Sequence, residues 1–184
     1  SRIPYFLDEK HTILMNPFIE YIRAALEMVT KGFSYESVFR YLRCDMSGLG
    51  RDQVDMLENY VLALGIHGYK KWSEKWVRVY RTMDPEDIQV LNEYREIFVR
   101  EAEILAQGFS SGKRKVCEYC YSLYQFIASC EIQKKLKKQE LFFKEKGEKA
   151  LEKEYAQIYG IVMELLDRMV EILGEEEITR TEFV

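Results

Sequence analysis

The sequence is poor in proline, glycine, cysteine and histidine: three prolines, ten glycines, four cysteines and two histidines among 184 residues. So few prolines and glycines argue against a fold of many strands and turns, and against disorder. The irregularly spaced cysteines fit reduced thiols in a cytoplasmic protein better than a disulfide framework. No apolar run approaches the roughly 20 residues of a membrane-spanning helix, and no signal-peptide pattern is present. We therefore expect a cytoplasmic domain with no membrane contact.

An overall basic field is also missing. Acidic residues outnumber lysine and arginine by 31 to 27, for a net charge of −4. Any contact with nucleic acid would therefore have to be local. What the sequence does have is a large apolar fraction, 47% of its residues. That is enough for a buried core, and one domain is the default expectation.

Helical periodicity dominates the sequence. Apolar positions recur every three or four residues between start signals such as Asn16-Pro17 and stop signals such as Gly65. The predicted helices run from 16 to 32, 35 to 43, about 51 to 65, 84 to 108, 111 to about 147, and 155 to 173. The sequence predicts a mainly α, bundle-like domain of six or seven helices with a short extended segment, "IPYFL", near its start.

A lysine-rich run, "KKLKKQELFFKEKGEKALEK", covers residues 134 to 153. Lysine moderated by glutamate at this density is typical of a solvated helix face or a helical hairpin. Gly147 is the expected turn. The final predicted helix stops at Gly174, a residue type that commonly ends helices.

Several patterns that could carry chemistry do not fit their motifs. "CEYC" (117–120) has the CxxC spacing, but both cysteines lie on a predicted helix beside apolar positions, and His11 and His67 stand alone. "GFSSGKR" (108–114) is one residue too short between its glycines for a phosphate-binding loop, and Arg114 replaces the required hydroxyl residue. We therefore predict no catalytic residue, no metal ligand and no cofactor in this chain.

The turn "SGLG" (47–50) leads directly into a predicted helix. Backbone N–H groups at such a turn point toward the positive end of the helix dipole, which suits a phosphate. The candidate DNA-binding residues here are Gly48, Gly50 and Arg51. The alternative is a simple tight turn with no ligand.

The second candidate is "HGYKKWSEKWVRVYR" (67–81), with five cations and one glutamate. Trp72, Trp76 and Tyr80 recur every four residues, so a helix would place these rings on one face. That separation favours rings packed on the core and cations in water over DNA contact. The candidate phosphate contacts are the cations of the outer face, namely Lys70, Lys71, Lys75 and Arg78.

Four stretches together resemble the AddB family of Firmicutes helicase–nuclease subunits. They are "IPYFLDEK" (3–10), "NPFIEYIRAALEMV" (16–29), "YESVFRYLR" (35–43) and "DMLENYVLALGIHG" (55–68) followed by Trp72. The similarity is dense to about residue 80 and weaker beyond it. "IPY" followed by a helix running into "FRYLR" also resembles the point where UvrD-type helicases enter their helical 2B insertion, in which a Gly-x-Gly turn touches duplex DNA.

The resemblance implies a fragment of a DNA end-processing subunit for recombinational repair. Residues 1–15 would enter from a neighbouring helicase-like domain, 16–174 would form the 2B-like domain, and 175–184 would begin a truncated following element. An AddA-type partner would supply the ATP-driven motor, and double-stranded DNA would be the ligand. The family's iron–sulfur cluster, Mg and nuclease site would lie outside this segment. The alternative is a helical protein–protein scaffold without DNA contact.

Overall fold

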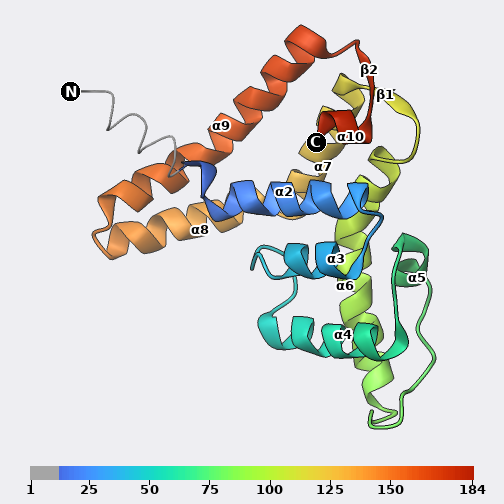
Figure 1. The fold of residues 1–184 in the computed structure, drawn as a ribbon. Coiled ribbons are helices and arrows are strands. Elements are labelled where there is room, and N and C mark those ends of the chain that lie inside the picture. Colours follow the sequence, from blue (N-terminus) through green and yellow to red (C-terminus); the bar gives the residue numbers. More distant parts are fainter. Residues whose placement is uncertain (1–12) are drawn as a thin grey trace.

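The protein is described by a computed structural model, in which residues 13–184 are described (Figure 1). Helices dominate it, which confirms the predicted mainly α class. The helices are α2 (Pro17–Thr30), α3 (Tyr35–Leu42), α4 (Arg51–Leu64), α5 (Tyr69–Ser73), α6 (Asp87–Gly108), α7 (Val116–Ser129), α8 (Ile132–Glu145), α9 (Lys149–Leu173) and α10 (Arg180–Phe183). Two short strands, β1 (Lys113–Lys115) and β2 (Glu177–Thr179), complete the described part of the chain. The predicted "IPYFL" strand and His11 lie outside it.

Local signals set several helix ends as predicted. The Asn16 side chain accepts a hydrogen bond from the Phe18 N–H at 2.9 Å, and Pro17 occupies the first helical position. At the other end of a helix, Gly65 closes α4 in the left-handed conformation, with φ +63°. The lysine-rich run forms the expected hairpin of α8 and α9, and Gly147 turns it with φ +72°.

The single helix predicted from 111 to about 147 is wrong, because two features interrupt it. Residues 113–115 form β1, which pairs antiparallel with β2 in the register Arg114 to Ile178. Further along, Glu131 adopts a left-handed backbone with φ +54°, and this ends α7 and redirects the chain into α8. Apolar periodicity continues through both interruptions, so it carried no sign of either break.

Helix α6 runs through the middle of the fold and contacts α2, α4, α5 and α7 (Figure 1). Its last residue, Gly108, lies against Ser122 of α7 so closely that an added Cβ would fall 2.2 Å from the Ser122 Oγ. Only glycine therefore allows this approach of α6 to α7. Beyond it, Phe183 of α10 packs its ring on Phe109 and Tyr119, so the last described residues return to the end of α6 and to α7.

No helix among the described residues combines the length and the apolar character needed to cross a lipid bilayer.

Candidate nucleic-acid interface

The basic segment, residues 67–81, is not the helix that its ring spacing predicts. Helix α5 ends at Ser73, and the backbone is extended from Glu74, whose ψ is 141°. The expected burial of the rings is nevertheless confirmed, since Trp72 is 1% exposed and Trp76 is 4% exposed. Within residues 74–79 only Trp76 is buried, and its neighbours Lys75 and Val77 are exposed.

Two buried polar side chains of α6 hold the basic segment in this conformation. The Asn92 side chain accepts from the Trp76 N–H at 3.0 Å and donates to the Trp76 carbonyl at 2.8 Å, as a neighbouring strand would. Arg95 donates to the Trp72 carbonyl at 3.0 Å and to the Asn92 side chain at 2.9 Å. These bonds replace those that a longer helix would make within itself.

Neither anchor was identified from the sequence, although a signal was present. Asn92 and Arg95 occupy the inward stripe of α6 together with Leu91 and Phe98, and both are buried. A polar residue in an apolar stripe must find a hydrogen-bond partner once it is buried. Desolvation lowers the pKa of Arg95, and the adjacent Glu96 raises it in part.

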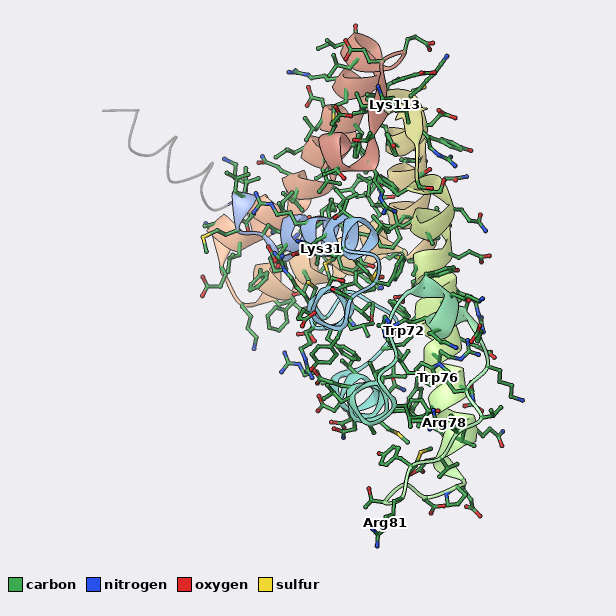
Figure 2. All side chains as sticks on the ribbon, turned by 45° about the vertical axis from the view of Figure 1, so that its right-hand side comes forward. Lys31, Trp72, Trp76, Arg78, Arg81 and Lys113 are labelled. Carbon is green, nitrogen blue, oxygen red and sulfur yellow. The ribbon has the colours of Figure 1, made fainter. Side chains whose placement is uncertain are left out.

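The predicted cations of the basic segment all face outward. Lys71 is paired with Glu74 at 3.1 Å, whereas the side chains of Lys70, Lys75 and Arg78 make no hydrogen bond or ion pair within residues 13–184. Figure 2 shows Trp72 and Trp76 among the helices and Arg81, a further exposed cation, at the outer end of the molecule.

A hollow of about 280 Å³ opens between the turn after α4 and the extended stretch. Lys71, Lys75 and Arg78 line it on one side and His67 on the other, with Glu74 as its single acidic residue. Its floor is aromatic, because the rings of Tyr60 and Trp76 stack with their centroids 4.6 Å apart. The hollow therefore gathers three cations beside one acidic residue, over two rings that are themselves buried.

The Gly-x-Gly turn lies elsewhere and uses its N–H groups internally. The Gly48 N–H donates to the Glu101 carboxylate, and the Gly50 N–H donates to the Gln53 side chain at 2.9 Å. A Cβ added at Gly48 would lie 3.0 Å from Glu101 Oε1 and 3.1 Å from Ile97 Cγ2, so a larger residue there would press on both side chains. Hence the N–H groups that would receive a phosphate already have partners inside the chain.

Arg51 is 81% exposed along its side chain and is paired with Asp45 at 2.7 Å. Its guanidinium lowers the pKa of Asp45. Arg51 begins α4, and the hollow lies along the other end of that helix at Tyr60 and Leu64, which puts them about 14–20 Å apart at 1.5 Å per residue. The intervening surface of α4 carries Asp52, Asp55 and Glu58, so the structure does not join the two candidate sites by a positive strip.

Glu101 ties the Gly-x-Gly turn to the core. Its second carboxylate oxygen accepts from the Tyr41 hydroxyl at 2.9 Å, and that hydroxyl is 2.8 Å from the hydroxyl of Tyr21. Desolvation raises the pKa of Glu101, and the hydrogen bonds from Gly48 and Tyr41 offset this only in part. Burial thus disfavours the ionised carboxylate in the folded state.

Glu101→Gln is therefore expected to change the pH dependence of stability. Because the folded-state pKa of Glu101 lies above its ordinary value of 4.5, its contribution to stability is fully present below pH 4.5 and is lost as the pH rises through the folded-state pKa. Glutamine does not ionise. The unfolding free energy of the variant minus that of the wild type, from urea titrations, should rise between pH 4 and pH 7. An equal difference at both pH values would contradict this account.

The described residues offer no group of three histidine, cysteine or acidic side chains that could hold a metal ion. Cys120 and Cys130 are buried, and burial raises the pKa of the Cys120 thiol to about 11.

No protein-family model matches the chain. Three curated relatives are each named as the B subunit of an ATP-dependent helicase/deoxyribonuclease. The protein from Lachnoclostridium phytofermentans is 40% identical over 184 residues, that from Clostridium novyi 41% over 185, and that from Clostridioides difficile 34% over 189. Each alignment covers 98 to 99% of this chain but only 16% of the relative. Over this limited part of their length, the chain is a homologue of the AddB proteins, the B subunits of ATP-dependent helicase/deoxyribonucleases.

Proposed function

We propose that this chain is a non-catalytic, 2B-like helical domain of a longer AddB-type subunit, and that it helps to position duplex DNA during double-strand-break end processing and recombinational repair. The ATP-driven motor belongs to an AddA-type partner subunit. Nuclease chemistry, with its Mg and iron–sulfur cluster, belongs to other parts of the complex. The proposed location is the cytoplasm, where the DNA of a bacterium lies.

The observation that carries this proposal is the anchored basic segment. Asn92 and Arg95 fix its backbone from inside, and Trp72 and Trp76 are buried beneath it. Its cations are thereby presented from a rigid base, which reduces the ordering cost of binding. Lys70, Lys75 and Arg78 have no internal partner among the described residues, so contact with phosphate would break no existing ion pair.

These cations would contact the phosphate backbone and not the base edges. Lysine and arginine on an exposed segment neutralise phosphates and release counterions, without reading sequence. Arg51 and the turn at Gly48 and Gly50 form a second, separate contact in this proposal. Since the N–H groups of Gly48 and Gly50 are engaged internally, the phosphate contact there would fall to Arg51, which would exchange its ion pair with Asp45 for it. The net charge of −4 limits the affinity of the isolated chain.

Lys75→Glu/Arg78→Glu is expected to weaken duplex binding by about tenfold or more at low salt, because two phosphate contacts become repulsive. Fluorescence anisotropy of a labelled duplex, measured over a series of salt concentrations, tests this. The slope of log K against log salt should become shallower by about two.

The matched control is Lys144→Glu/Lys149→Glu, which makes the same change in net charge on the α8–α9 hairpin. It should retain most of the wild-type affinity. Equal losses in both double variants would show that net charge alone governs binding, and unchanged binding by Lys75→Glu/Arg78→Glu would refute the proposed interface.

A further inference from the structure

A second surface, formed by α7 and α9, is apolar and exposed. Tyr121 and Tyr124 of α7 are 62% and 49% exposed, and Val170 of α9 is 41% exposed. Large apolar side chains scattered singly need no explanation, but these three line one continuous depression.

The depression is a groove of about 510 Å³ between the two helices. Each helix contributes one stripe of neighbouring positions, spaced three or four residues apart. The α7 stripe consists of Cys117, Cys120, Tyr121 and Tyr124, and the α9 stripe of Tyr159, Met163, Leu166, Asp167 and Val170. The α9 stripe runs from Tyr159 to Val170, a rise of about 16 Å or three helical turns. These dimensions suit the apolar face of a helix lying along the groove.

The edge of this groove is acidic. Asp167 lines it, and Glu171 lies one turn further along α9; neither makes a hydrogen bond or an ion pair within the described residues. The nearby cations are already engaged, since Arg168 pairs with Glu164 and Lys115 pairs with Glu175. A ligand therefore meets uncompensated negative charge beside an apolar floor.

We propose that the α7–α9 groove binds an amphipathic protein helix whose apolar ridge is flanked by lysine or arginine. Charge complementarity selects this occupant, because a basic flank would pair with Asp167 and Glu171. A second copy docked symmetrically through the same face would set acidic edge against acidic edge. The relatives are about six times as long as the aligned segment, so each carries ample chain from which such a helix can come.

This inference does not use the DNA-facing cations and stands on its own observations. Its test uses two model peptides: a helical peptide with a leucine stripe flanked by lysines, and the same peptide with serines in place of the leucines. Cys117 lines the groove and Cys44 lies elsewhere, and both are partly exposed. Alkylation of each thiol is followed by mass spectrometry. The rate at Cys117 reports on occupancy of the groove, and the rate at Cys44 serves as the internal reference.

At a concentration about nine times its Kd, where occupancy is roughly 90%, the leucine peptide should slow alkylation of Cys117 by about tenfold and leave Cys44 unchanged. The serine peptide should protect neither thiol. Tyr124→Ser/Val170→Ser should abolish protection, and Asp167→Lys/Glu171→Lys should weaken it. Because these side chains are exposed, the variants should fold. Leu141→Ser on α8, at a residue 47% exposed, is the matched control and should protect Cys117 like the wild type.

Three results would overturn the proposal. Equal protection by the serine peptide would show attraction by charge alone. Undiminished protection in Tyr124→Ser/Val170→Ser would place the peptide elsewhere. Concentration-dependent self-association in sedimentation experiments, with Cys117 protected in the absence of peptide, would identify a second copy of the chain as the occupant.

Discussion

Trp72→Ala is expected to lower the free energy of unfolding by about 3–5 kcal/mol, the usual range for deleting a fully buried aromatic side chain. The Trp72 ring is 4.5 Å from the Phe98 ring, 5.2 Å from Trp76 and 6.3 Å from Phe39, between centroids. Its removal leaves a cavity where α3, α5 and α6 meet. Thermal unfolding followed by circular dichroism should show a melting temperature lower by roughly 6–20 °C.

Val77→Ala is the matched control for Trp72→Ala. Val77 lies in the same segment and is 75% exposed, so its truncation should change the unfolding free energy by less than about 0.5 kcal/mol. A Trp72→Ala variant as stable as Val77→Ala would show that the segment is not packed on the core as described.

Asn92→Leu is expected to lower the free energy of unfolding by about 2–6 kcal/mol, because it leaves the buried N–H and carbonyl of Trp76 without partners at about 1–3 kcal/mol each. It should also loosen residues 74–80, which hold Lys75 and Arg78, and so weaken duplex binding. Trp72 and Trp76 are the only tryptophans in the sequence, so their fluorescence reports directly on this segment. Their emission should shift to longer wavelength in the variant.

One further substitution at Asn92 changes its hydrogen bonds while keeping its size, and one substitution elsewhere on α6 is the control. Asn92→Asp keeps the acceptor for the Trp76 N–H and for Arg95 but loses the donor to the Trp76 carbonyl, so its loss of stability should be intermediate. Gln89→Ala, at an exposed position one turn earlier on α6, should have little effect. Equal stability of Asn92→Leu and Gln89→Ala would refute the anchoring role of Asn92.

Sequence patterns predicted the helix ends well where the residues that set an end lie close to it in the sequence. The cap at Asn16 and the left-handed stop at Gly65 depend on residues within a few positions of one another. The basic segment was misread because its determinant is distant. The bond between the Asn92 side chain and the backbone of Trp76 joins residues 16 positions apart, and spacing within 67–81 contains no trace of it.

In the candidate site, too, features set by nearby residues could be predicted and features set by distant residues could not. Exposure of Lys70, Lys75 and Arg78 could be predicted because cations seldom lose their hydration. The internal use of the Gly48 N–H could not, since its acceptor Glu101 lies 53 residues away. The resemblance to the AddB family rests on short local stretches such as residues 16–29 and 35–43, and relatives 40–41% identical over nearly the whole chain confirm it.

Helix α6 sets the distance between the two proposed binding surfaces. Its 22 residues extend about 33 Å, with Asn92 and Arg95 bound to the basic segment toward one end and Gly108 locked against α7 at the other. A helix of this length resists bending, so the proposed DNA-facing cations and the α7–α9 groove stand at a nearly constant separation. Duplex DNA held at the proposed cations would therefore lie at a set distance from a helix bound in the proposed α7–α9 groove.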